Sequence, residues 1–301
     1  MIYTLTMNPA LDYVIQVNHF KTGVVNHTTS EHVYYGGKGI NVSVVLRELG
    51  FESQCMAFVA GFTGKEIMHG IQEKLQLDAD FIEVAQGRTR INVKMFSDEE
   101  TEINGQGPIV TDADVQKLFH KLDRLEDDDM LVLSGSIPSS MCSTIYRDIL
   151  AYLSHKNIKV VVDTTGDLLK ETLAYRPFLV KPNHHELADL FQVEIQDLSD
   201  IEYYARQLQK MGAQNVLISM AKDGSLLIDE YGHSHRLGVC QGTVVNSVGA
   251  GDSMVAGFIA GYLSQMNYLE TLKLATASGG ATAFSSDLAS KEKIDELLKQ
   301  L

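Results

Sequence analysis

The chain has 301 residues, 45% of them hydrophobic and 21% charged, which is the composition of an ordinary globular protein. Its length predicts a large domain with a smaller appendage, and its formal net charge of −14 argues against nucleic acid or an anionic membrane as a partner. No apolar run reaches the roughly 20 residues that span a bilayer. The widely spaced Cys55, Cys142 and Cys240 favour reduced thiols in a cytoplasm over disulfides.

Apolar, β-branched segments alternate with segments of helical period along the chain. The pattern predicts strands at 2–6, 53–60, 130–133, 159–163, 178–180 and 215–219, and helices near 39–49, 65–75, 112–124, 140–155, 183–191, 199–211, 250–263, 268–284 and 291–300. Near-continuous apolar strands between helices indicate a mostly parallel sheet covered on both faces. We therefore expect an α/β protein with three layers, α/β/α.

Two segments break this rhythm. Residues 12–35 and 88–104 alternate between polar and apolar side chains, and the second segment has a hairpin turn at 97–100. They predict a small β-sheet outside the main layer. The expected division is a core of residues 1–11, 36–87 and 106–301, with the small sheet formed by 12–35 and 88–105.

A glycine-rich turn, Val248-Gly249-Ala250-Gly251-Asp252-Ser253, opens onto an apolar helix near the C-terminal end. Glycines let the backbone approach a ligand closely, and the first amides of a helix favour an anion. A carboxylate beside such a cradle indicates proton chemistry, so Asp252 is a candidate base. The alternative is that Asp252 is a helix N-cap in an ordinary glycine turn.

A second glycine-rich turn precedes the first predicted helix. Asn8-Pro9-Ala10-Leu11-Asp12, GGKGIN at 36–41 and NSVGAGDSMVAGF at 246–258 occur in the order seen in the ribokinase-like sugar kinases. The chain resembles most closely their phosphofructokinase B branch, over nearly its whole length.

This resemblance implies an ATP- and magnesium-dependent kinase of a ketohexose phosphate, with fructose 1-phosphate as the first candidate. Asp252 would be the base, and the amides of Gly249, Ala250 and Gly251 the anion hole. The alternatives are kinases of tagatose 6-phosphate or fructose 6-phosphate, and a sugar-phosphate or nucleotide sensor, against which the intact Asp252 argues. A dinucleotide-binding module is excluded because no GxGxxG follows the first strand.

The resemblance also assigns the sugar phosphate to one group of residues and implies a lid formed by the small sheet, through which two subunits would form a homodimer. The expected substrate-binding residues are Asp12, Gly36, Gly37, Lys38, Asn41, Arg90, Ser136 and His27. Asp12 could instead be an ordinary turn residue, and Lys38 a solvated lysine. His27 stands where the branch usually has arginine, which leaves open how the phosphate is held.

A second group is assigned to the nucleotide. It comprises Lys181, Asn183, Ser219, Ala221, Gly224, Val248, Ala275, Ser278, Gly279 and Thr282, with Asn183 and Glu186 expected to hold magnesium largely through water. Asn183 and Glu186 could also form a helix capping box. Ala221 replaces a usual glycine, and the four small residues at 275–282 could equally serve close helix packing.

Overall fold

The computed structural model describes all 301 residues. Its central sheet has the order β14 (Ser234–Leu237), β13 (Ser225–Ile228), β12 (Asn215–Ser219), β11 (Leu179–Val180), β10 (Lys159–Asp163), β9 (Met130–Ser134), β1 (Ile2–Thr6), β4 (Gln54–Ala60), β5 (Asp78–Ala79), and β6 (Ile82–Val84) also pairs with β4. All neighbours are parallel except β12–β13 and β13–β14. The mostly parallel sheet expected from the sequence is confirmed.

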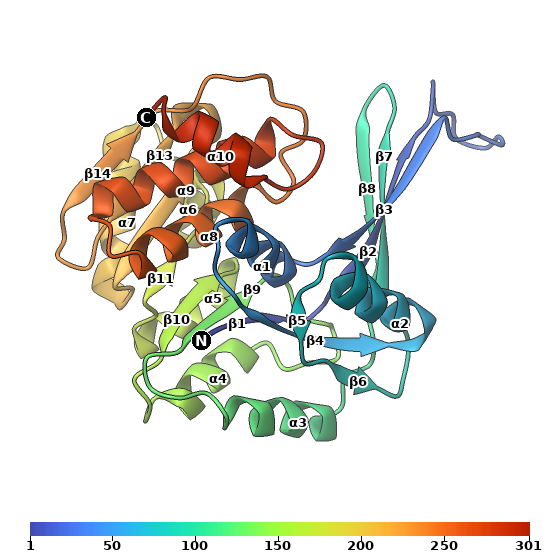
Figure 1. The fold of residues 1–301 in the computed structure, drawn as a ribbon, viewed down its shortest axis with the longest axis horizontal. Coiled ribbons are helices and arrows are strands. Elements are labelled where there is room, and N and C mark those ends of the chain that lie inside the picture. The colour runs from blue at the N-terminus through green and yellow to red at the C-terminus, as the bar shows by residue number, and fades with distance from the viewer.

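Helices cover both faces of this sheet (Figure 1). They are α1 (Lys38–Glu48), α2 (Gly61–His69), α3 (Asp112–Leu122), α4 (Ile145–Leu153), α5 (Gly166–Thr172), α6 (His184–Phe191), α7 (Leu198–Met211), α8 (Ala250–Leu263), α9 (Tyr268–Ala283) and α10 (Lys291–Leu298). One buried cluster packs the sheet against α3 to α7, and another packs its other face against α1, α8, α9 and α10. Leu131 and Leu133 join the first cluster and Val132 the second, as alternation along a strand requires.

A second, four-stranded sheet stands out from the core (Figure 1). Its order is β3 (Ser30–Gly36), β2 (Ala10–Gln16), β7 (Arg90–Phe96), β8 (Glu100–Asn104). The β7–β8 hairpin turns at the predicted place, so the separate small sheet is confirmed. Its role as a lid stays a prediction.

Several short elements differ from the sequence prediction. The antiparallel edge formed by β13 and β14, the seven-residue α5 and the short β5 and β6 were not predicted, because segments this short carry little periodicity. The helix expected from 140 begins at Ile145, since turns at Pro138 and Cys142 precede it. The helix expected at 65–75 starts earlier, at Gly61, and ends in a π-helical segment at Gly70–Lys74. No helix is both long and apolar enough to cross a membrane.

Candidate active site

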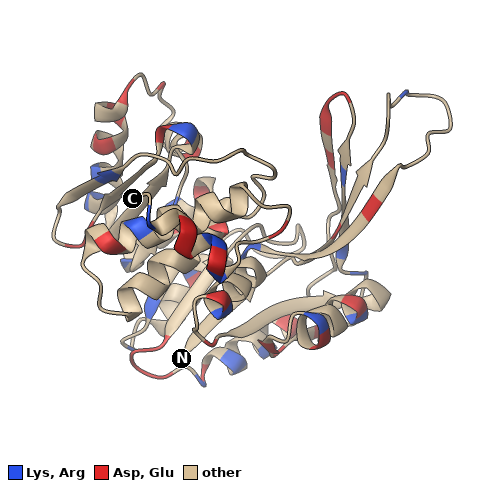
Figure 2. Cartoon of the chain, turned by 45° about the horizontal axis from the view of Figure 1, so that its top comes forward, with Lys and Arg blue, Asp and Glu red and all other residues tan.

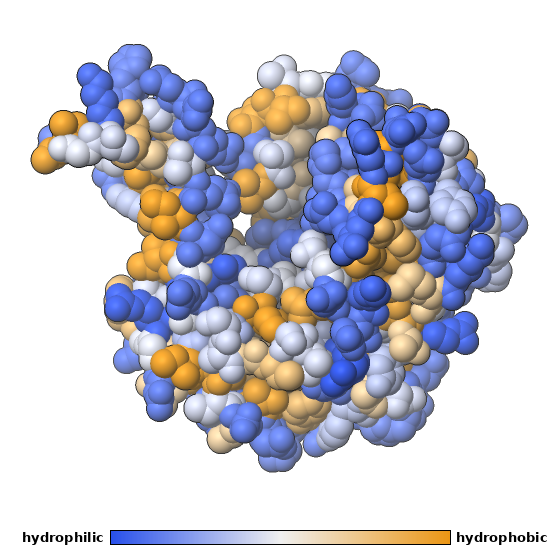
Figure 3. All heavy atoms as spheres, turned by 180° about the vertical axis from the view of Figure 1, so that it is seen from behind, coloured by the Kyte–Doolittle hydropathy of each residue, from blue (hydrophilic) through white to orange (hydrophobic).

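The carboxyl ends of the central strands meet the base of the small sheet around a pocket of about 350 Å³. Lys38 at the start of α1, Arg90 of β7 and Glu186 of α6 line it together with Ser136, which follows β9. Figure 3 shows the hollow between the small sheet and the core. In open α/β sheets, ligands bind at this edge.

Three buried polar atoms in this pocket have no hydrogen-bond partner: Thr6 Oγ1, Asn8 Oδ1 and Ser134 Oγ. Thr6 and Ser134 end neighbouring parallel strands and are register partners. A buried polar atom without a partner costs free energy, so such atoms usually face a ligand or an ordered water. The pocket is therefore equipped to bind a polar molecule.

Asp252 lies beside this region, in the first turn of α8, and is 5% exposed. Asn41 of α1 donates a hydrogen bond from Nδ2 to Asp252 Oδ2 at 2.7 Å. Burial, followed by the charge of Asp163, raises the pKa of Asp252 to about 6, against the opposing effects of Lys38, Asn41 and Lys181. A carboxylate tuned toward neutrality in a ligand pocket is suited to accept a proton.

The glycine-rich turn leaves the N-terminus of α8 open. Gly249 is the N-cap, with φ of +80°, and no side chain caps the helix, so the alternative that Asp252 is the N-cap is wrong. A Cβ on Gly249 would lie 2.6 Å from Leu288 Cδ2, and one on Gly251 would lie 3.1 Å from Lys181 Nζ. The Ala250 amide donates to the Ser247 carbonyl oxygen at 3.2 Å, whereas the amides of Gly249 and Gly251 make no hydrogen bond within the chain. The last two amides are thus free for an anion, with the Lys181 ammonium close to Gly251.

Asp163, at the end of β10, is a site residue that sequence reasoning missed. It is almost fully buried, 3.3 Å from Lys38 Nζ and 3.4 Å from Lys181 Nζ. Burial alone would raise its pKa, but Lys181 and Lys38 together hold the pKa below its usual value. The same pairing raises the pKa of Lys38. The available signal was an acid at the carboxyl end of an apolar predicted strand, where ligands bind in open α/β sheets.

Positive groups gather here although the chain is strongly acidic. Lys38, Lys181 and Arg90 lie around the pocket and the glycine-rich turn, whereas acidic side chains are spread over surface helices and the small sheet (Figure 2). Arg90 donates from Nε to the Asn8 carbonyl at 3.0 Å. Burial lowers the pKa of its guanidinium, and the nearby Asp12 opposes that shift.

Asp12 lies on β2, on the side of the small sheet that carries Arg90. Asn92 Nδ2 donates to its Oδ1 at 2.8 Å, and Lys94 Nζ lies 3.1 Å from its Oδ2. A Cβ on Gly36 would come within 2.7 Å of the same carboxylate, so glycine is needed there. Sequence reasoning missed both Asn92 and Lys94.

His27 is not near this pocket. It is exposed in the loop between β2 and β3, which Figure 1 places at the far end of the small sheet. No hydrogen bond or ion pair joins it to another residue of the chain. Within one subunit, the structure therefore gives His27 no part in the site.

On the nucleotide side, Asn183 and Glu186 form the capping box of α6, with both hydrogen bonds at 2.8 Å. Asn183 also forms an isolated parallel β-bridge with Ser219 at the end of β12. Ala221 has φ of +48°, which explains why glycine is usual at that position. Gly224 has φ of +95°, and a Cβ there would collide with the Leu237 carbonyl oxygen at 2.0 Å.

The four small residues of α9 are buried in its interface with α8. Thr282 Oγ1 lies 2.7 Å from Ser253 Oγ, and Ser278 Oγ donates to a carbonyl of its own helix. A Cβ on Gly279 would lie 2.5 Å from Met254 Cγ. Close helix packing accounts for Ala275, Ser278, Gly279 and Thr282, and their contact with adenine stays a prediction. Val248, in contrast, is exposed just before the glycine-rich turn.

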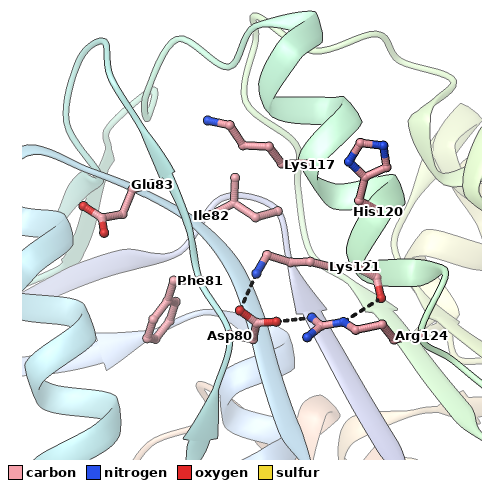
Figure 4. A pocket seen from close by; sticks show the side chains of 8 residues that line it. All are labelled: Asp80, Phe81, Ile82, Glu83, Lys117, His120, Lys121 and Arg124. Carbon is pink, nitrogen blue, oxygen red and sulfur yellow. Dashed lines mark hydrogen bonds and ion pairs between the residues drawn. The ribbon is translucent and has the colours of Figure 1, made fainter.

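A larger hollow of about 530 Å³ lies elsewhere, between residues 80–83 and α3 (Figure 4). Its charged side chains largely satisfy one another: Lys121 and Arg124 both pair with Asp80, and Lys117 pairs with Asp114 at 2.8 Å. It contains none of the unpartnered buried atoms found in the first pocket. The pocket at the carboxyl edge of the sheet is therefore the candidate active site.

Comparison with known proteins agrees with this geometry. Residues 5–294 match the pfkB family of carbohydrate kinases. The chain belongs to this family. It is 42% identical to a protein of Bacillus subtilis named 1-phosphofructokinase, covering 100% of this chain and 98% of that one, and 33% identical to a D-tagatose-1-phosphate kinase of Bacillus licheniformis with the same coverage.

Among solved structures, this kinase resembles phosphofructokinase-2 from Escherichia coli in complex with substrates and products. The TM-score is 0.93 at 24% sequence identity, with 100% of this chain and 99% of the other covered. The shared fold confirms the ribokinase-like α/β architecture with its second small sheet.

Proposed function

We propose that this kinase transfers the γ-phosphoryl group of ATP to the C6 hydroxyl of fructose 1-phosphate, giving fructose 1,6-bisphosphate and ADP. One observation carries the proposal: a pocket with unpartnered buried polar atoms is bordered by the cationic Lys38 and Arg90. Hydroxyls and a phosphate together satisfy such a lining, whereas an unphosphorylated sugar would leave Arg90 without an anionic partner. The names of two relatives, both kinases of ketohexose 1-phosphates, support the position of the phosphate.

In the proposed mechanism, Asp252 accepts the proton of the attacking hydroxyl. Its burial and raised pKa support this role, since a base with a pKa near 6 is ionised at neutral pH yet still basic. The amides of Gly249 and Gly251, which make no hydrogen bond within the chain, and the ammonium of Lys181 would stabilise the charge on the transferred phosphoryl group. Asn41 would hold Asp252 in the required rotamer.

Magnesium would be held mainly by Glu186 and by the phosphates of ATP. Asn183 Oδ1 and one Glu186 oxygen are engaged in the capping box, which leaves the other Glu186 oxygen free at the pocket. One carboxylate with several waters is a usual arrangement for this ion, whose charge helps to neutralise the phosphates.

An ADP-release assay tests the substrate. We expect kcat/KM to be highest for fructose 1-phosphate among fructose 1-phosphate, tagatose 1-phosphate, fructose 6-phosphate, tagatose 6-phosphate and free fructose. A preference for tagatose 1-phosphate would support the second relative's activity instead. ATP binding without turnover of any of the five would favour a sensor.

We also propose that two copies associate through the small sheet. Val33, Tyr13, Val93 and Ile103 are register partners that form one row across its strands. Val33 is 51% and Ile103 65% exposed, which is unusual for aliphatic side chains on a sheet. A second copy presenting the same row would cover them.

A further inference from the structure

The buried face of β7 is polar, the reverse of an ordinary amphipathic strand. Arg90, Asn92 and Lys94 occupy alternate positions of β7 and therefore share one face. Asn92 is 6% and Lys94 8% exposed. On the opposite face, Ile91 is 39% exposed, whereas Met95 further along is buried. A buried ammonium is costly unless a partner offsets its lost hydration. The partner of Lys94 explains this reversal.

That partner is Asp12, and the two donors from β7 engage both of its oxygens. β2 and β7 pair in parallel with Asp12 opposite Asn92, so Lys94 lies one step further along the same face. The Gly105 amide donates to Asn92 Oδ1 at 3.2 Å, which turns the Asn92 Nδ2 toward Asp12. Lys94 is in no other ion pair.

This arrangement leaves Asp12 little freedom. Its Oδ1 is held by Asn92, its Oδ2 is held by Lys94, and the carboxylate lies against the backbone of Gly36. Each carboxylate oxygen can accept a second hydrogen bond. A carboxylate fixed in this way is ready to accept hydrogen bonds from vicinal hydroxyls without first losing rotational freedom.

We propose that Lys94 is a positioning residue that fixes the Asp12 carboxylate for the hydroxyls of the ketohexose phosphate. The inference rests on the proposed function. Lys94 thus acts through Asp12, and the small sheet supplies an oriented hydrogen-bond acceptor.

A double-mutant cycle tests this role. We expect Lys94→Met to raise KM for fructose 1-phosphate by about 10- to 100-fold, the usual effect of losing a charge-assisted hydrogen bond, with kcat and KM for ATP nearly unchanged. Lys94→Arg should restore most of the loss. In an Asp12→Asn background, Lys94→Met should add less than about threefold, because no carboxylate remains to be positioned.

Lys65→Met is the matched control, since Lys65 is exposed on α2 and in no ion pair. Additive effects in the cycle would overturn the proposal and indicate that Lys94 contacts the substrate phosphate itself. An unchanged KM in Lys94→Met would also overturn it. Lys94→Gln serves the same cycle if the methionine variant unfolds at assay temperature.

A crystal structure of Lys94→Met separates this inference from the proposed function. We expect the Asp12 carboxylate to rotate away from its present position or to become disordered. If it stays in place, the inference fails whatever the substrate is. If it moves while wild type phosphorylates no ketohexose phosphate, the proposed function fails and the positioning role stands.

Discussion

At the scale of single residues, the site depends on charges that are buried together. Asp252, Asp163 and Lys181 are almost fully buried, and Lys38, whose side chain is partly exposed, pairs with Asp163 at their edge. In such surroundings, the loss of one charge affects the others, because Coulomb interactions are weakly screened. Burial raises the pKa of Asp252 toward neutrality.

Replacement of Asp252 tests its role as the base. We expect Asp252→Asn to lower kcat by about 10²- to 10⁴-fold, since it removes the proton acceptor but keeps the side chain's shape. The Kd for ATP, measured by calorimetry, should change little. Asp112→Asn, at an exposed acid of α3, is the control. More than half of the wild-type kcat in Asp252→Asn would contradict the assignment.

The pKa of Asp252 also predicts a pH dependence. Because the base must be ionised, kcat/KM should fall about tenfold per pH unit below about pH 6 and level off above it. The substrate phosphate ionises in the same range, so we compare wild type with Asn41→Ala. The variant loses a hydrogen bond that lowers the pKa, so its profile should shift to higher pH. Superimposable profiles would show that Asp252 does not govern activity.

At the scale of elements, long segments were predictable and short ones were not. The apolar runs at β1, β10 and β12 predicted strands, and the structure has these strands at the predicted residues. The candidate site residues in glycine-rich turns could be predicted because each of these motifs is one continuous stretch of sequence. Asp163 and Asn92 were missed because their partners Lys38 and Asp12 lie 125 and 80 positions away. Such contacts exist only after folding.

The turn after β12 gives a prediction about backbone strain. Ala221 is held in the left-handed region, where a Cβ is unfavourable. We expect Ala221→Gly to stabilise the protein by about 0.4–1 kcal/mol in urea unfolding, despite the greater freedom of glycine in the unfolded chain. Ala174→Gly, at an exposed position without positive φ, should instead destabilise by about 0.5–1 kcal/mol. Destabilisation by both changes would mean that the turn relaxes in solution.

At the scale of the whole molecule, the acidic surface and the cationic pocket have opposite effects on anionic substrates. The net charge of −14 repels ATP and a sugar phosphate at long range. Lys38, Arg90 and Lys181 bring positive charge close to the site, where Lys38 and Lys181 also pair with Asp163. The small sheet contributes Arg90 and Asp12 to this region, so its position relative to the core matters for binding.

Association through the small sheet is the prediction that concerns the whole molecule. We expect wild type to sediment as a dimer and Ile103→Lys as a monomer, because an ammonium buried in the apolar row without a partner costs roughly several kcal/mol. Leu269→Lys, at an exposed position at the start of α9, should leave the dimer intact. Sedimentation velocity at several concentrations measures both. A monomeric wild type, or a dimer that tolerates lysine at 103, would show that the second copy does not cover this face.

A dimer would also bring the loop that carries His27 next to another subunit, which offers His27 a contact that one chain does not.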